Sequence, residues 1–269
     1  MTDATTLAVI GGGRMGEAIV GGLLAAEFVP AGAIAVAEPD VARRDVLAST
    51  YGVRVVSSAG AALRGAATVL LAVKPQVMDA VVADLAPALP PDALVVSIAA
   101  GVSCSRLESN LPSGTAVVRV MPNTPALVGQ AMSVVSGGSE ATAEQAEYVR
   151  SLFAALGEAI VLEERYQDAA AAISGSGPAY VALFVDALSR AGVRHGLPRQ
   201  VAQQLAVQTL RGTADLIDGT GQHPEQLVDA VSSPGGTTIA ALEALEAGGF
   251  RAALAAAVAA AVKRAKELA

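Results

Sequence analysis

The chain has 269 residues, 53% of them hydrophobic, and a formal net charge of −7. Its length and apolar content allow a large buried core, in one domain or two. The acidic balance, without a basic cluster, argues against nucleic acid as a partner and against binding to an anionic membrane surface. The single cysteine, Cys104, excludes an internal disulfide and fits the cytoplasmic location that we expect.

The sequence predicts no targeting segment and no membrane partner. The stretch Met1–Gly13 lacks a charged region followed by a long apolar one, so it does not have the pattern of a signal peptide. The longest apolar run, Ala252–Val262, is too short to span a bilayer at ~1.5 Å per residue. No group of His, Cys, Asp and Glu has the spacing of a metal site, and we expect no metal.

Short β-branched runs alternate with helical stretches up to about residue 163. The runs are apolar on both faces, which is typical of parallel strands covered by helices. This alternation predicts an α/β fold, a Rossmann-type doubly wound sheet, over residues 1–163. The predicted strands are Leu7–Ile10, Ile34–Ala37, Val53–Val56, Thr68–Val73, Leu94–Ala99 and Ala116–Val120, extended by Met132–Val135 and Ala159–Val161.

After about Glu164 the strand patterns stop and helical patterns follow. Several of these begin with proline at or near the first helical position, where the missing N–H costs nothing, and glycines separate them. We therefore predict a C-terminal all-α domain over residues 164–269. Its predicted helices are Pro178–Ala191, Pro198–Ile217, Pro224–Ala230, Thr237–Ala247 and Phe250–Leu268.

A glycine-rich turn, GGGRMG, follows the first predicted strand and opens a helix. Gly11, Gly13 and Gly16 stand in G-x-G-x-x-G register. The first permits a tight turn, the second lets the backbone approach a pyrophosphate, and the third lets the helix pack on the strand. The helix N-terminus supplies N–H donors and a partial positive charge. The motif in this context predicts a dinucleotide site.

The end of the second predicted strand bears on the choice of nucleotide. Glu38 follows Gly16 by 22 residues, where an acidic side chain accepts hydrogen bonds from a ribose 2′-OH and favours NAD. Arg43 and Arg44 lie one helical turn further on and could instead hold a 2′-phosphate, or simply form a solvated helix face. These residues alone leave the choice open between NADP(H) and NAD(H).

Other strand ends supply further candidate residues, because ligands bind at the C-terminal edge of a parallel sheet. Lys74, before Pro75, could meet a phosphate, order the cofactor loop, or be a plain surface lysine. Asn123 could line the cleft or only cap its loop. The residues we expect to bind the cofactor are Gly11, Gly12, Gly13, Arg14, Met15, Gly16, Glu38, Ala72, Val73, Lys74, Pro75, Ala100 and Asn123.

Two segments of the helical half place serine or threonine and glycine directly before a helix: Ile173–Tyr180 and Ser232–Thr238. Small side chains leave backbone N–H groups bare at a helix N-terminus, which suits an anion. The alternative is an ordinary helix cap. The doubled glycine and four hydroxyls of the second segment exceed what a cap needs, so we favour an anion site there.

The motifs GGGRMG, AVKP, MPNTP, SGSGPAY and SSPGGTT, with the following GGFR, occur in this order. Together they resemble the pyrroline-5-carboxylate reductase family over essentially the whole chain, and the stretch from Ser232 through Arg251 is the most specific part. The resemblance implies hydride transfer from NADP(H) or NAD(H) to the C=N bond of 1-pyrroline-5-carboxylate, giving L-proline in proline biosynthesis. It also implies a homodimer through the helical half, further assembled into a ring, with each site formed by the cofactor cleft of one subunit and the helical loop of the other.

The resemblance also implies roles for particular residues. The SSPGGTT loop, with Ser233, Gly235, Gly236, Thr237 and Thr238, would bind the substrate carboxylate through backbone N–H groups. Thr238 would be the catalytic residue, hydrogen-bonded to the ring nitrogen, and Glu164 would lie near the substrate. One departure concerns the cofactor: family members that prefer NADPH often carry serine or arginine at the position of Glu38 and asparagine near Ala59.

The sequence alone leaves other functions open as alternatives. A 3-hydroxyacid dehydrogenase shares the two-part layout, but it uses a catalytic lysine in the helical half, and no lysine lies between residues 75 and 262. Reductases of other cyclic imines are harder to separate. A binding protein without chemistry would not need Thr238 or the anion site. His223 precedes a helix and is interpreted as a surface cap, and Cys104 as a small buried side chain.

Overall fold

The computed structural model describes residues 6–268 and contains two compact units. Unit 1 comprises the described residues up to Ser176 together with those from Val262 onward. Unit 2 comprises Gly177–Ala261. The boundary after residue 163 that the sequence suggests stays a prediction about folding domains.

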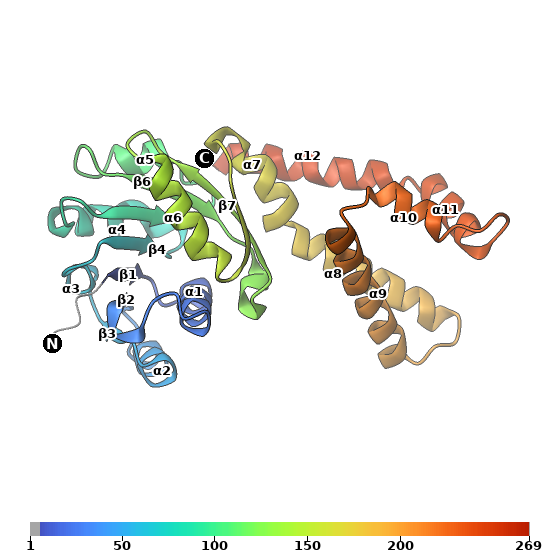
Figure 1. Cartoon of the computed structure of the whole chain (residues 1–269), viewed down its shortest axis with the longest axis horizontal. Helices are drawn as coiled ribbons and strands as arrows, with labels where there is room; N and C mark the ends of the chain where they lie inside the picture. Colours follow the sequence, from blue (N-terminus) through green and yellow to red (C-terminus); the bar gives the residue numbers. More distant parts are fainter. Residues whose placement is uncertain (1–5, 269) are drawn as a thin grey trace. The chain divides into compact units, whose positions relative to one another are not determined.

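Unit 1 is built on an eight-stranded sheet with the order β3-β2-β1-β4-β5-β6-β7-β8 (Figure 1). All neighbouring strands are parallel except β6 and β7, so the six strands expected to be parallel are so, and β7 extends the sheet in the antiparallel direction. These two strands are joined through a short 3₁₀ helix, and a parallel connection needs a crossover of about a dozen residues or more. The strands are β1 (Leu7–Ile10), β2 (Ile34–Ala37), β3 (Arg54–Val56), β4 (Thr68–Leu71), β5 (Leu94–Ser97), β6 (Val117–Met121), β7 (Ala131–Gly137) and β8 (Gly157–Val161).

Helices cover both faces of the sheet, as the apolar strands require. Leu7 and Val9 of β1 belong to a core cluster with side chains of α1, α2 and α6. Ala8 and Ile10, on the other face, belong to a second cluster with side chains of α3, α4 and α5. The helices of unit 1 are α1 (Arg14–Ala25), α2 (Val41–Tyr51), α3 (Ala59–Ala62), α4 (Met78–Leu85), α5 (Cys104–Glu108), α6 (Ala143–Ala154) and α7 (Gln167–Ala170), with short turns η1 (Ala31–Ala33), η2 (Pro75–Val77), η3 (Ala86–Ala88), η4 (Thr124–Val128), η5 (Glu164–Tyr166) and η6 (Ala171–Gly175).

Unit 2 is helical, and the structure confirms the five helices that the sequence predicts after Glu164. Three of them have the predicted bounds, whereas the first two extend a few residues beyond their predicted ends. The helices are α8 (Gly177–Arg194), α9 (Arg199–Thr220), α10 (Pro224–Ala230), α11 (Thr237–Ala247) and α12 (Phe250–Leu268), whose residues from Val262 group with unit 1.

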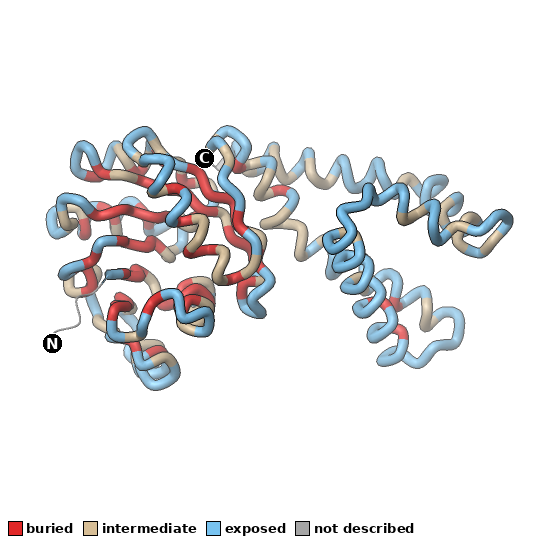
Figure 2. The backbone as a smooth tube through the Cα atoms, in the orientation of Figure 1, coloured by how far each residue is buried: buried red, intermediate tan, exposed pale blue. Residues whose placement is uncertain are grey.

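Unit 2 lacks a core of its own. Most of its backbone is coloured as exposed or intermediate in Figure 2, and among its residues only Ser189, Ala202 and Ala206 are buried. Large apolar side chains such as Leu183 (70% exposed) and Leu205 (53% exposed) are accessible to solvent. Many exposed large apolar side chains on one unit are typical of a surface that binds a partner. The exposed apolar side chains of unit 2 must therefore be buried by something other than unit 2 itself.

One helical stretch, Glu164–Arg194, is long and apolar enough to cross a membrane by length and composition, with mean hydropathy 1.3 and 6% of the tested window buried. The bent pair Thr237–Ala247 and Phe250–Glu267 passes the same test only when taken together. This stretch has no uninterrupted apolar run of membrane-spanning length, so the sequence pattern alone does not indicate it. Exposed helices that pack on another protein chain have the same composition, so length and composition alone do not identify a membrane span.

Candidate active site

The glycine-rich turn forms a cradle between β1 and α1. Gly11 has a φ of +110°, and a side chain there would come within 2.6 Å of the carbonyl oxygen of Ala72. A Cβ at Gly16 would collide with the carbonyl oxygen of Gly11, so the helix packs directly on the turn. Gly13 caps α1 without a side-chain hydrogen bond, and a Cβ there would meet nothing within 4 Å. Bare N–H groups at an open helix start fit the pyrophosphate of a dinucleotide.

Glu38 lies directly after β2, beside this cradle. Its Oε2 accepts a hydrogen bond from the backbone N–H of Gly12 at 3.0 Å, and its Oε1 accepts one from Asp40 at 2.9 Å. The structure thus brings Glu38 to the glycine turn, as the spacing predicts. Its contact with a ribose stays a proposal.

The two arginines of α2 are engaged within the chain. Arg43 Nη2 donates to the carbonyl oxygen of Gly12 at 2.6 Å and pairs with Glu17 Oε2 at 2.7 Å. The hydrogen bond with Glu17 raises the pKa of Arg43. Arg44 Nη1 donates to the carbonyl oxygen of Pro39 at 2.6 Å. These contacts exclude the interpretation of Arg43 and Arg44 as a merely solvated helix face. Both side chains hold the loops around the cradle.

The remaining predicted cofactor residues lie at the same edge of the sheet. Ala72, Val73 and Lys74 follow β4, whose neighbour is β1, and Val73 Cγ1 would lie 3.1 Å from a Cβ at Gly11. Pro75 begins η2, and Ala100 follows β5. The strand order therefore gathers the loops after β1, β2, β4 and β5 at one edge.

Asn123 ties loops together within unit 1. Its Nδ2 donates to the carbonyl oxygen of Ser174 at 3.0 Å, and its Oδ1 accepts from the N–H of Met132 at 2.9 Å. The side chain is buried. Both ends of the amide are used inside the chain, which favours the loop-holding role over a free amide in the cleft.

A buried arginine that the sequence analysis missed holds Glu164. Arg119, on β6 with a side chain 8% exposed, lies 3.2 Å from Glu164 Oε1 and 3.8 Å from Asp168 Oδ1. The same Oε1 accepts a hydrogen bond from the N–H of Cys104 at 2.8 Å. Glu164 thus links η5 to the start of α5, and a contact with substrate stays a proposal. The signal was available in the run AVVRV, because a charge inside an apolar strand requires a buried partner.

Arg119→Met is expected to lower the free energy of unfolding by about 2–3 kcal/mol, because it leaves the carboxylates of Glu164 and Asp168 without their cation. The loss stays below that of a fully buried pair because these side chains are 29% and 28% exposed. Urea denaturation at fixed protein concentration measures it. Arg150→Met, which breaks an exposed pair with Glu147, is the control and should change stability little. Equal stability of the two variants would contradict the role of Arg119.

Cys104 is buried, as expected, and has no catalytic character. Burial, with the nearby Glu164 carboxylate, raises the pKa of its thiol to about 12. A thiol with such a pKa stays protonated at neutral pH and is a poor nucleophile. Within residues 6–268, no three His, Cys, Asp or Glu side chains form a group that could hold a metal ion.

The SSPGGTT segment forms an open loop before α11. Gly235 adopts a φ of +67°, and the N–H of Gly236 donates to the carbonyl oxygen of Ser233 at 2.9 Å. Gly236 caps α11 without any side-chain hydrogen bond. The first N–H groups of a helix have no acceptor inside it, so those of Thr237 and Thr238 are available to an external anion.

Arg251 of the GGFR motif fixes the ends of α11 and α10. Its Nε donates to Glu246 Oε1 at 2.6 Å, and its Nη2 donates to Glu225 Oε1 at 2.8 Å. His223 caps α10, with Nδ1 accepting from the N–H of Glu225 at 3.3 Å. This confirms the interpretation of His223 as a surface cap.

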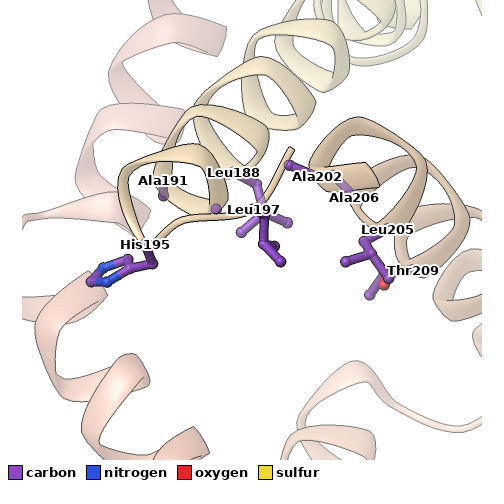
Figure 3. Close-up of a pocket in the computed structure, with 9 residues that line it drawn as sticks. Leu188, Ala191, His195, Leu197, Ala202, Leu205, Ala206 and Thr209 are labelled. Atoms are coloured by element: carbon purple, nitrogen blue, oxygen red, sulfur yellow. The ribbon is translucent and has the colours of Figure 1, made fainter. Parts of the chain in front are cut away.

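The other histidine borders an apolar pocket of about 300 Å³ between α8 and α9 (Figure 3). Leu188, Leu197 and Leu205 line the pocket, and the imidazole of His195 projects away from Leu197 and Leu205 (Figure 3). No acid, base or nucleophile converges with His195 among the lining residues. The pocket is therefore part of the exposed apolar surface of unit 2 and not a catalytic site.

Comparisons with known proteins show to which family the chain belongs. Residues 164–268 match the family described as pyrroline-5-carboxylate reductase dimerisation, and residues 6–101 match the family described as NADP oxidoreductase, coenzyme F420-dependent. The pyrroline-5-carboxylate reductase of Synechocystis sp. is 47% identical over 97% of this chain and 97% of the relative. The chain belongs to the pyrroline-5-carboxylate reductase family.

Solved structures of pyrroline-5-carboxylate reductases have the same fold. The protein from Coxiella burnetii superposes with a TM-score of 0.94 at 35% identity, covering 99% of each chain. The protein from Plasmodium falciparum, solved with NADP bound, gives a TM-score of 0.88 at 31% identity, covering 100% of this chain and 99% of that one. The Rossmann-type sheet followed by a helical dimerisation segment is therefore confirmed, and the 3-hydroxyacid dehydrogenase alternative is not supported.

The dimerisation match also accounts for the exposed helices of unit 2. Residues 164–268 include every helix of that unit, and in this family they are the segment through which two copies associate. A homodimer follows from this match. A second copy of the chain is then the cover that the apolar side chains of α8 and α9 require.

Proposed function

We propose that this chain reduces the C=N bond of 1-pyrroline-5-carboxylate with hydride from NADPH or NADH and yields L-proline, the last step of proline biosynthesis. The observation that carries this function is the full-length match to pyrroline-5-carboxylate reductases, at 47% identity to the protein of Synechocystis sp.. The chain is accordingly an NAD(P)H-dependent oxidoreductase. The glycine cradle and the open start of α11 supply the two binding functions that such a reaction needs.

The nucleotide binds at the cradle of Gly11, Gly13 and Gly16. NAD(P)H, when bound, supplies the hydride. The bare N–H groups at the start of α1 would bind its pyrophosphate, since a helix of 12 residues adds its dipole to these donors. The edge loops after β4 and β5, with Lys74 and Ala100, border the same site. The match of residues 6–101 to NADP oxidoreductases supports this assignment.

The substrate carboxylate binds at the start of α11. In this proposal Ser233, Gly235 and Gly236 shape the loop, and the N–H groups of Thr237 and Thr238 donate to the carboxylate. Gly236 uses its own N–H within the loop, so the donors lie on the helix itself. A carboxylate at a helix N-terminus is stabilised by both hydrogen bonds and the dipole.

Reduction of the imine needs little general acid–base catalysis from the protein. A cyclic imine can arrive protonated, so hydride transfer requires no strong acid from the protein. In this proposal the Thr238 hydroxyl hydrogen-bonds the ring nitrogen and orients the C=N bond. Fixing the imine against the hydride donor can lower the barrier by ~7–11 kcal/mol in favourable intramolecular reactions. The catalytic contribution of the chain is then chiefly orientation.

Thr238→Ala is expected to lower kcat about 10- to 100-fold, the range for a hydrogen bond to a charged group. The dissociation constant of NADPH should not change, because Thr238 acts on the imine. Thr238→Ser, which keeps a hydroxyl, should recover most of the loss. Steady-state kinetics of the three proteins measure this, with Thr213→Ala on α9 as the control. Wild-type kcat in Thr238→Ala would overturn the role of Thr238 but not the reaction.

Two further features belong to the proposal. We place the protein in the cytoplasm, which its single buried cysteine fits. We also propose that its dimers assemble into a ring, as the resemblance of the sequence to the family implies. Sedimentation velocity of the purified protein distinguishes a dimer from a larger closed assembly.

A further inference from the structure

We propose that Glu38 selects nucleotides without a 2′-phosphate, so that this chain binds NADH more tightly than NADPH. This inference rests on the proposed function for the location of the nucleotide. It concerns which of the two cofactors the site prefers, and the argument uses the contacts of Glu38 and of the two arginines on α2.

Glu38 is held in the position that meets an adenosine ribose. It follows the last residue of β2, and the carboxyl end of β2 borders the turn between β1 and α1. Both carboxylate oxygens accept backbone hydrogen bonds, from Gly12 at 3.0 Å and from Asp40 at 2.9 Å. A carboxylate fixed in this way keeps its remaining lone pairs available to ribose hydroxyls.

The carboxylate lies directly against the nucleotide turn. A Cβ at Gly12 would come within 3.1 Å of Glu38 Oε2 and 2.5 Å of Leu47 Cδ1. Glu38 therefore cannot move towards α1 without displacing the turn. A nucleotide seated on the turn meets this negative charge at close range.

Arg43 and Arg44, the two cations that would bind a 2′-phosphate, already make hydrogen bonds within the chain. Arg43 is shared between the carbonyl oxygen of Gly12 and the carboxylate of Glu17. Arg44 donates to the carbonyl oxygens of Glu38 and Pro39. Moving either guanidinium onto a phosphate would break these bonds, so the gain from the new contact is reduced by the loss of the old one.

The charges then favour NADH. A phosphate monoester carries about −1.5 to −2 charges at neutral pH, and like charges at close range repel. The 2′-OH of NADH instead donates a hydrogen bond to Glu38. A hydrogen bond to a charged acceptor corresponds to about a tenfold or larger change in dissociation constant.

The test measures binding of NADH and NADPH to the purified full-length protein by isothermal titration calorimetry, without imine. Wild type should bind NADH more tightly. Glu38→Ser should lower the ratio of the NADPH to the NADH dissociation constant about tenfold or more. Asp45→Asn, an exposed carboxylate on α2, is the control and should leave the ratio unchanged. Glu17→Gln, which frees Arg43, should tighten NADPH binding more than NADH binding.

Tighter binding of NADPH by wild type, or an unchanged ratio in Glu38→Ser, would overturn the inference while the proposed reaction stands. If Glu38→Ser does not fold, Glu38→Gln removes the charge at nearly the same side-chain length, and the same shift of the ratio is expected. Failure of wild type to bind either nucleotide would overturn both the inference and the proposed function.

Discussion

Leu183→Asp is expected to prevent dimer formation and to abolish imine reduction. Leu183 lies on α8, within the dimerisation segment, and its side chain is 70% exposed in the single chain. Burying a leucine contributes about 1.5–3 kcal/mol, and a twofold interface carries the residue on both copies. An aspartate there replaces this gain with two charges that must lose their water.

Size-exclusion chromatography with light scattering measures the result. Leu183→Asp should elute as a monomer or as aggregates, and wild type as a dimer or a multiple of dimers. Val46→Asp, on α2 of unit 1 and 44% exposed, is the matched control and should keep the mass of wild type. A Leu183→Asp protein with wild-type mass would show that α8 is not covered by a second copy.

The second large effect is expected at the glycine cradle. Gly16→Ala should abolish detectable binding of NADPH and NADH, because the added Cβ would collide with the carbonyl oxygen of Gly11. Relief of this clash must move α1 away from the turn, and with it the N–H groups that we propose bind the pyrophosphate. Overpacking of this kind also lowers stability, by about 1–3 kcal/mol.

Calorimetric titration and thermal unfolding separate the two consequences. Gly212→Ala provides the control, since a Cβ at Gly212 on α9 would meet nothing within 4 Å. That variant should bind both nucleotides as wild type does. Unimpaired nucleotide binding by Gly16→Ala would mean that the cradle is not the pyrophosphate site.

The sequence predicted the strands and helices well where a local pattern defines them. β1 and β2 have the predicted bounds because buried runs of four residues are followed at once by turn residues. β4 ends at Leu71, two residues early, because Ala72 and Val73 leave the ladder to form the edge loop beside Gly11. The direction of β7 was missed, although the short link through η4 was a usable signal.

The site was predictable in part. Spacing placed Glu38 beside the glycine turn, because β1 and β2 are neighbours in this fold. Spacing could not show that Arg43 pairs with Glu17, or that Arg119 pairs with Glu164, since both contacts depend on how distant segments pack. The open start of α11 was recognisable from its glycines alone.

The most direct test of the central claim is the reaction itself. Purified protein is mixed with 1-pyrroline-5-carboxylate and either NADPH or NADH, and both nucleotide oxidation and L-proline are followed. The account predicts that L-proline forms in step with nucleotide oxidation. Absence of turnover with both nucleotides, although they bind, would contradict it and indicate a different imine or a protein that binds without reducing.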